Sequence, residues 1–345
     1  MDLVSDPRLR EIIEQIKPHV EANPAPTIRQ APHGPAQRDA WYADVTRERE
    51  RQQALTVQMS GGVPAVPDGV EVTEISIPVT GRCGWDGCAP CTAGQIAAIV
   101  YRPLEAVDSP AYLNFHGGGF WIGGGIDMLR LSTPVHAARA LALGAAVIDV
   151  DYRMTPTHKF PLPVEDGYAA LTWIADNAAA IGVDPSRIAV GGSSAGGTMA
   201  SAVALMSRDR GGPALSALVL HIPATDSSCN SESMRTFAEG YTMTRQHAFE
   251  MWDMYLSVPA DAHNPYASPL HAATLRGLPP ALVVLGDYDV LRDEGAAFAQ
   301  RMVEDGITVT LRRMPQTHGA LLPENLGETE RLIIDHLRVN LSTQR

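Results

Sequence analysis

A glycine-rich turn between an apolar strand and a helix constrains this chain more than any other feature. The run Val190-Gly191-Gly192-Ser193-Ser194-Ala195-Gly196-Gly197 follows the apolar residues 187–190 and precedes the small, apolar residues 198–206. A strand that turns directly into a helix leaves no space for side chains, so glycine is required at positions 192 and 196, and one residue between them is strained and exposed. Only Ser194 is the centre of a Gly-x-Ser-x-Gly pattern, because Ala195 excludes a pattern centred on Ser193. We therefore predict Ser194 as a nucleophile at a helix N-terminus, where developing negative charge is favoured.

Strands and helices alternate along most of the chain. Short apolar runs predict strands, and longer periodic stretches predict helices. The expected strands cover residues 70–77, 95–101, 111–115, 145–150, 187–190, 217–222, 281–285 and 307–311, and the expected helices cover residues 128–143, 164–180, 198–206, 293–304 and 324–341. Continuously apolar strands separated by helices indicate a mostly parallel sheet with helices on both faces. The predicted fold class is therefore α/β.

The predicted nucleophile needs a base. A serine hydroxyl is a weak nucleophile until a base within hydrogen-bond reach, oriented by a third group, takes its proton. His318, in Gln316-Thr317-His318-Gly319, lies in a loop just after the last expected strand, and we predict it as this base. Most of the other histidines are expected to be structural or exposed; His221, for example, lies inside an expected strand.

The orienting acid is expected between Ser194 and His318, in the chain order serine, acid, histidine. The loop after the strand at 281–285 offers Asp287, Asp289 and Asp293, and Asp226 follows the preceding strand. Asp293 has the position of a first-turn residue of the next helix. We predict Asp289 as the acid, with Asp287 as the second candidate.

A glycine run after the strand at 111–115 supplies backbone donors. His116-Gly117-Gly118-Gly119 presents N–H groups that no side chain obstructs, and the N–H group of Ala195 completes the set. Acyl transfer needs such donors, aimed at the oxyanion that develops in the transition state. A phosphate-binding loop is the alternative, but neither a Gly-x-Gly-x-x-Gly context with an acid downstream nor a Gly-Lys-Ser/Thr motif is present.

Taken together, these motifs resemble those of the hormone-sensitive-lipase-like (bacterial type IV) carboxylesterases. The resemblance runs from about residue 95 to the C-terminus and is carried by His116-Gly117-Gly118-Gly119-Phe120, Asp151-Tyr152-Arg153 with Phe160-Pro161, Gly192-x-Ser194-Ala195-Gly196-Gly197, Asp289-x-Leu291-Arg292-Asp293-Glu294-Gly295 and His318-Gly319. It implies a triad of Ser194, Asp289 and His318, and an oxyanion hole of Gly118, Gly119 and Ala195. The choice of Asp289 over Asp287 depends largely on this comparison.

The resemblance also implies an α/β-hydrolase fold with a helical cap. Residues 1–60 read as helices without strands, and residues 227–260 interrupt the strand–helix alternation. We therefore expect a cap portion at 1–60, a catalytic core at 61–226 and 261–345, and a cap insertion at 227–260.

The expected activity is hydrolysis of small-to-medium acyl esters through an acyl-enzyme. An amidase or a lactonase with the same triad is the alternative, because triad geometry does not choose the leaving group. A non-catalytic receptor on the same fold is a further alternative, disfavoured because serine, acid and histidine are all present. Ser193 departs from the family, which usually has Asp or Thr at this position.

Composition bears on partners and location. The 27 Lys and Arg residues against 39 Asp and Glu residues give a net charge of −12, which argues against nucleic acid and anionic membrane surfaces as partners. No apolar run approaches a membrane span, and charged residues occupy the first twenty positions, where a signal peptide needs an apolar region. We expect a cytoplasmic protein whose partner is a small-molecule ester, and leave a homodimer open.

Three of the four cysteines, Cys83, Cys88 and Cys91, lie close together in sequence. They resemble part of a metal site, but a closed zinc site needs four ligands, and Cys229 is distant. A disulfide and a loop of reduced thiols are the other interpretations, and the choice stays open. No metal and no cofactor is predicted.

Overall fold

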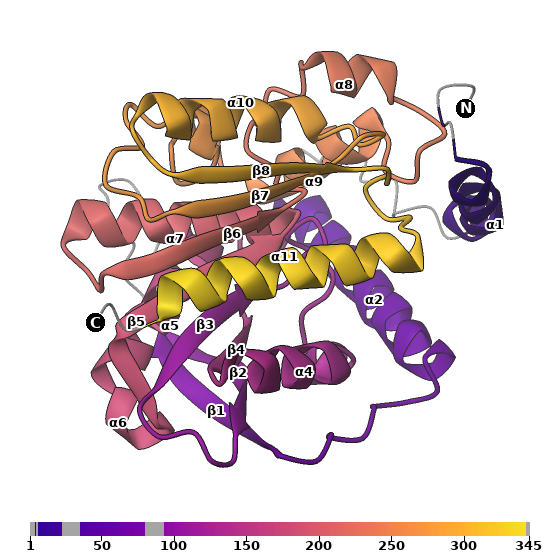
Figure 1. Ribbon diagram of the computed structural model, residues 1–345. Helices are drawn as coiled ribbons and strands as arrows, with labels where there is room; N and C mark the ends of the chain where they lie inside the picture. The colour runs from indigo at the N-terminus through magenta and orange to yellow at the C-terminus, as the bar shows by residue number, and fades with distance from the viewer. Residues whose placement is uncertain (1–3, 5, 23–34, 80–92, 343–345) are drawn as a thin grey trace.

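One eight-stranded sheet forms the centre of the computed structural model, which describes residues 4, 6–22, 35–79 and 93–342 (Figure 1). The strand order is β1-β2-β4-β3-β5-β6-β7-β8. The first two pairs, β1 with β2 and β2 with β4, are antiparallel, and all the other pairs are parallel, which confirms the predicted fold class. The strands are β1 (Val70–Val79), β2 (Gly94–Pro103), β3 (Ser109–Phe115), β4 (Ala146–Asp151), β5 (Val183–Ser193), β6 (Leu215–His221), β7 (Ala281–Gly286) and β8 (Val309–Met314).

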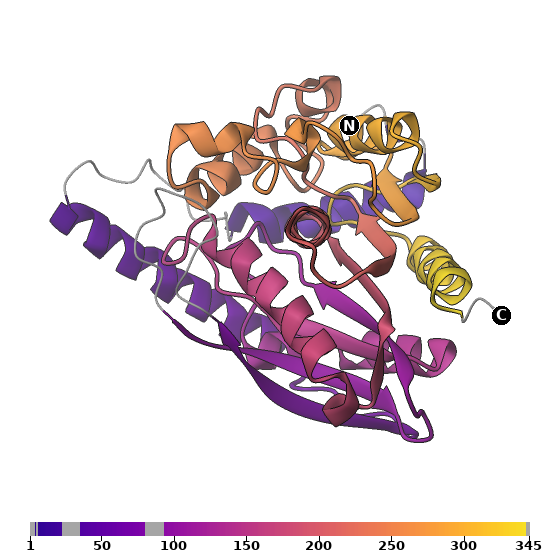
Figure 2. The same cartoon turned by 90° about the vertical axis from the view of Figure 1, so that its left-hand side faces the viewer.

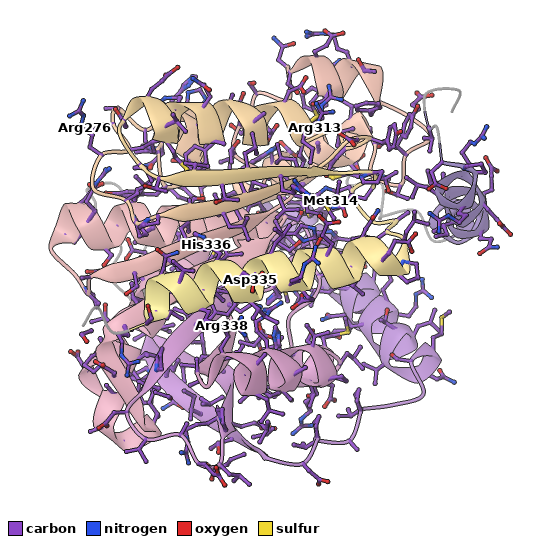
Figure 3. The ribbon with its side chains drawn as sticks, in the orientation of Figure 1. Arg276, Arg313, Met314, Asp335, His336 and Arg338 are labelled. Atoms are coloured by element: carbon purple, nitrogen blue, oxygen red, sulfur yellow. The ribbon has the colours of Figure 1, made fainter. Side chains whose placement is uncertain are left out.

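Helices cover both faces of the sheet (Figure 1). On one face, α4 (Thr133–Leu143) and α11 (Pro323–Leu341) pack in one buried cluster with Val147, Val219 and Leu282 of the strands. Arg338 of α11 also donates to the Ala142 carbonyl at the end of α4, at 3.1 Å (Figure 3). The other face packs against α5 (Leu162–Asp176), α7 (Ala195–Arg210) and α10 (Arg292–Glu304) in the larger cluster. The central strands, which are apolar and buried on both faces, therefore form the core, whereas the edge strands β1 and β8 are largely exposed.

Two helices that the sequence predicts as continuous are broken. The stretch 128–143 divides into α3 (Ile126–Arg130) and α4, because Pro134 lacks an N–H group and fits only the first turn of a helix. The stretch 164–180 divides into α5 and α6 (Ala178–Ile181), where the side chain of Asn177 donates to the Trp173 carbonyl at the end of α5. The last strand begins at Val309, because the N–H group of Ile307 bonds to Met302 of the preceding helix.

Further helices lie beyond the carboxyl ends of the parallel strands. These are α1 (Pro7–Ala22), α2 (Pro35–Met59), α8 (Glu232–Thr236) and α9 (Arg245–Tyr255) (Figures 1 and 2). The short 3-10 helices η1 (Pro259–His263) and η2 (Pro269–His271) follow α9, and η2 packs against α7 and α10. Val45 of α2 packs with Trp121 and Met254 of α9 in one buried cluster. The division into cap and core domains stays a prediction.

The cysteine cluster and the expected lack of a membrane span are the two remaining predictions about the fold. Cys83, Cys88 and Cys91 lie outside the described residues. Among the described helices, none has the length and apolar character needed to cross a membrane.

Candidate active site

The turn between β5 and α7 holds Ser194 in a strained conformation. Its φ and ψ angles are 55° and −121°, outside the regions that L-residues ordinarily occupy. A side chain at Gly192 would collide with the backbone of Gly196, and one at Gly196 would collide with the Phe115 carbonyl. The N–H group of Ser194 donates to the His221 carbonyl at 2.9 Å. Both glycines are therefore required by close backbone approach, as the sequence pattern predicts.

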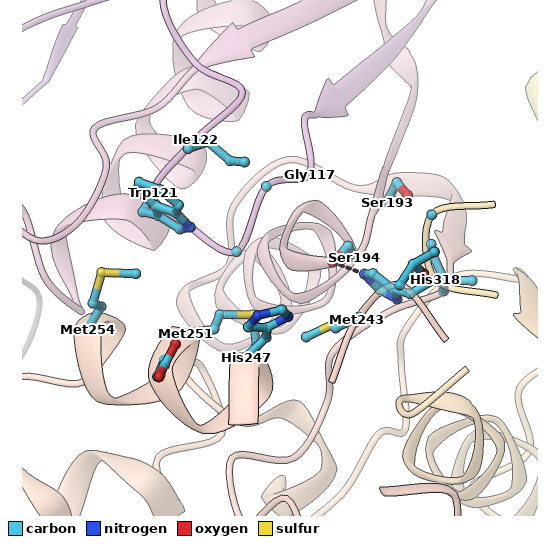
Figure 4. Close-up of a pocket in the computed structure, with 16 residues that line it drawn as sticks. Gly117, Trp121, Ile122, Ser193, Ser194, Met243, His247, Met251, Met254 and His318 are labelled. Carbon is cyan, nitrogen blue, oxygen red and sulfur yellow. Dashed lines mark hydrogen bonds between the residues drawn. The ribbon is translucent and has the colours of Figure 1, made fainter. Parts of the chain in front are cut away.

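The structure brings Ser194, His318 and Asp289 into one hydrogen-bonded chain. Figure 4 shows its first contact, between Ser194 and His318. Ser194 Oγ lies 2.8 Å from His318 Nε2, and His318 Nδ1 lies 2.9 Å from Asp289 Oδ2. The three residues come from the carboxyl ends of β5, β7 and β8, where parallel strands of an open α/β sheet place their ligand-binding loops. This is the arrangement of a nucleophile, a base and an orienting acid.

Of the four candidate acids, Asp289 contacts His318. It is buried, and its second oxygen accepts from the Leu291 N–H group at 2.9 Å. Asp287 pairs with Arg313 at 2.6 Å, Asp293 accepts from the Ser233 N–H group, and Asp226 lies 3.1 Å from His271. The direction of the side chains therefore distinguishes Asp289 from Asp287 as the partner of His318, a choice that the two positions in the sequence do not decide.

The glycine run lines the same cavity as Ser194 and His318. Gly118 and Gly119 have φ angles of 115° and 60°, and both line one cavity with Ser194. Within the described part of the chain, the N–H groups of these two glycines donate to no backbone carbonyl outside regular elements. Ala195 is the first residue of α7, so its N–H group has no intrahelical acceptor. Three backbone donors thus stand near Ser194.

A second polar chain lies beside the first, and the sequence reasoning missed it. Ser193 Oγ lies 3.2 Å from His221 Nδ1, and His221 Nε2 lies 3.1 Å from the amide nitrogen of Gln316. Burial, together with the smaller effect of the charge on His318, lowers the pKa of His221 to about 4. His221 is therefore neutral near pH 7. In the sequence, His221 lies inside an expected apolar strand, a position that indicates a structural histidine.

The histidine loop also contacts the segment before α9. Thr242 Oγ1 lies 3.0 Å from Thr317 Oγ1, directly beside His318. Thr242 and Ile222, which both line the cavity, have φ angles of 71° and 42°. Positive φ is costly for β-branched residues and is retained where the surroundings fix the backbone, often at binding sites.

The cavity over Ser194 has a volume of about 570 Å³. Its wall is mostly apolar and comes from the glycine loop and α9 (Figure 4). The larger apolar side chains in it are Trp121, Ile122, Ile222, Met243, Met251 and Met254. His247 and Glu250 of α9 add two ionisable groups. A concave, apolar site with a few polar groups has the usual character of a small-molecule site.

Comparison with known proteins places the chain in a family. The family model described as alpha/beta hydrolase fold matches residues 112–322. The carboxylic ester hydrolase LipN of Mycobacterium tuberculosis is 35% identical over 293 residues, which cover 82% of this chain and 72% of LipN. The carboxylesterase NlhH of the same organism is 37% identical over 68% of this chain and 73% of its own length.

Solved structures agree with these relatives. An esterase of Pyrobaculum calidifontis has a TM-score of 0.76 and 32% identity to this chain, and the match covers 97% of this chain and 98% of the esterase. Fold, motif order and relatives therefore point the same way. The chain belongs to the hormone-sensitive-lipase-like family of carboxylesterases, within the α/β-hydrolase superfamily.

Proposed function

We propose that this carboxylesterase works through an acyl-enzyme, with Ser194 as nucleophile, His318 as base and Asp289 as orienting acid. The observation that carries the proposal is the continuous chain of 2.8 Å and 2.9 Å contacts from Ser194 through His318 to Asp289. In this arrangement His318 Nε2 accepts the hydroxyl proton while Asp289 accepts from Nδ1–H and so fixes the tautomer.

The reaction then proceeds in two halves. Ser194 Oγ attacks the ester carbonyl as its proton moves to His318, and the tetrahedral intermediate collapses as His318 returns that proton to the leaving alcohol. Water, activated by the same histidine, attacks the acyl group and restores Ser194. The N–H groups of Gly118, Gly119 and Ala195 hold the oxyanion in both halves, and each such donor is worth roughly a hundred- to a thousand-fold in rate.

Cavity size supports small-to-medium acyl esters as substrates. A volume of about 570 Å³ lies within the range of small-molecule sites. Amide or lactone hydrolysis is the second candidate activity, because the same three residues serve any acyl leaving group. A cytoplasmic location remains a prediction from sequence, and a homodimer remains open.

Steady-state hydrolysis of 4-nitrophenyl acetate, butyrate and decanoate by two neighbouring variants tests the mechanism. We expect Ser194→Ala to lower kcat by about 10⁴-fold or more, because the nucleophile is lost. Ser193→Ala is the matched control and keeps most of the activity, since the described partner of its hydroxyl is His221 rather than His318. Equal losses in both variants, or undiminished turnover in Ser194→Ala, would contradict the proposal. The matching 4-nitroanilides test the amidase alternative.

A further inference from the structure

The apolar wall of the cavity carries one carboxylate that the proposed mechanism does not use. His247, Glu250, Met251 and Met254 share one face of α9 and line the cavity. The glutamate, Glu250, is only 7% exposed. Among the described residues that line the cavity, it is the only acid.

Glu250 is incompletely paired. Its Oε1 accepts from the Gln246 amide at 2.9 Å. Within the described ranges, Oε2 has no hydrogen-bond donor, and no lysine or arginine forms an ion pair with the carboxylate. Oε2 is not one of the buried oxygens without a partner, so it is accessible from the cavity. In a mostly apolar cavity a carboxylate attracts a cation more strongly than on the open surface. The open oxygen therefore leaves room for a positively charged partner.

The cationic groups of the neighbourhood are engaged elsewhere. Arg245 of the same helix donates to the Cys229 carbonyl at 3.1 Å and lies over the Phe249 ring. His247 Nδ1 accepts from the Thr244 N–H group at 3.3 Å, and burial lowers the pKa of this histidine, so it is neutral near pH 7. Neither Arg245 nor the neutral His247 therefore pairs with Glu250, although the charge of Glu250 acts on His247 and opposes the effect of burial there.

We propose that Glu250 binds a cationic group, an ammonium, on the ester substrate of this enzyme. Trp121 lines the same cavity, and an indole face attracts ammonium groups through its π-electrons. A carboxylate and an indole in one apolar cavity are the two kinds of group that bind such a cation while its alkyl parts meet the methionines. This inference rests on the proposed ester hydrolysis and specifies that the ester substrate is positively charged.

Matched pairs of esters that differ only in one charge test the proposal. Acetylcholine and 3,3-dimethylbutyl acetate place the charge on the alcohol side of the ester. The 4-nitrophenyl esters of 4-(trimethylammonio)butanoate and 5,5-dimethylhexanoate place it on the acyl side. The measured quantity is the ratio of kcat/KM for the charged and neutral members of each pair.

We expect the wild type to prefer the charged member of at least one pair by about tenfold or more, the effect of an ionic and a cation–π contact in a cavity largely removed from water. In Glu250→Gln this ratio falls several-fold, because the charged ester loses its carboxylate partner and keeps only the indole, while the neutral ester gains. Asp253→Asn is the matched control, since Asp253 is an exposed acid of the same helix outside the cavity lining, and its ratio stays at the wild-type value. No preference in either wild-type pair, or an unchanged ratio in Glu250→Gln, overturns the proposal.

A measurement on the wild type alone tests the cation site even if Glu250→Gln does not fold. Tetramethylammonium chloride is expected to inhibit hydrolysis of the neutral esters competitively, whereas potassium chloride at equal concentration does not. Equal effects of the two salts count against a cation site. Turnover of the neutral esters by the wild type reports the proposed hydrolysis itself, so failure of either claim is recognised separately.

Discussion

At the scale of single residues, the direction of each side chain decides which residues take part in the proposed triad. Asp287 and Asp289 lie in one loop, two positions apart, yet one pairs with a surface arginine and the other with His318. Ser193 and Ser194 are adjacent, yet their hydroxyls contact different histidines. Neighbouring residues of the same type thus provide the controls for one another.

The first prediction concerns the acid. Asp289→Asn is expected to lower kcat by about 10⁴-fold, because an amide in place of the carboxylate stabilises the wrong histidine tautomer. Asp287→Asn removes a partly exposed ion pair and is expected to leave ester hydrolysis within a few-fold of the wild type. Initial rates with 4-nitrophenyl butyrate distinguish the two. Greater loss in Asp287→Asn than in Asp289→Asn would reverse the assignment.

At the scale of elements, the junction of β5 and α7 is fixed by contact between backbones. The turn brings Gly192, Gly196 and the end of β3 so close that no Cβ fits between them. The strain at Ser194 is retained because the strand on one side and the buried helix on the other hold the backbone in place. Stability and the position of the nucleophile therefore depend on the same junction.

A pair of glycine substitutions tests this dependence. Gly196→Ala is expected to lower the free energy of unfolding by about 3 kcal/mol or more, because its methyl group would overlap the Phe115 carbonyl. Gly327→Ala, in α11 with open space around the Cβ position, is expected to raise it by about 0.5–1 kcal/mol through helix propensity. Urea denaturation measures both. Similar small effects at the two positions would show that the junction is loosely packed.

At the scale of the whole molecule, the features predicted from sequence are those set by local constraints. The turn at Ser194 and the order of strands and helices follow from glycine positions and apolar runs. The contact of Ser193 with His221 does not, because it arises from the parallel register in which these two residues are partners on β5 and β6. Glu250 was missed for a related reason: only the packing of α9 determines which of its faces lines the cavity.

The partly buried His221 links stability to pH. Its pKa is lowered from the ordinary 6.5 to about 4 in the folded protein, so the unfolded chain binds more protons between these values. Stability is complete above about pH 6.5 and falls as the pH drops toward 4, by at most about 3 kcal/mol from this group. His158, His247 and His336, whose pKa values burial also lowers, act in the same direction.

Denaturation at pH 7 and pH 4.5 checks this origin. His221→Gln cannot titrate, so the loss of stability between the two pH values is expected to be smaller in this variant than in the wild type. An equal loss in both proteins would assign the effect to other groups.

The central claim, that Ser194 carries the acyl group, is tested most directly by identifying the residue that an activated ester modifies. Diethyl 4-nitrophenyl phosphate transfers its phosphoryl group to an activated serine, and the stable adduct can be located by peptide fragmentation in a mass spectrometer. We predict one group per chain, on Ser194, with loss of activity in proportion to labelling and no labelling in His318→Ala. Modification of Ser193 or of another residue, or inactivation with Ser194 unmodified, would contradict the account.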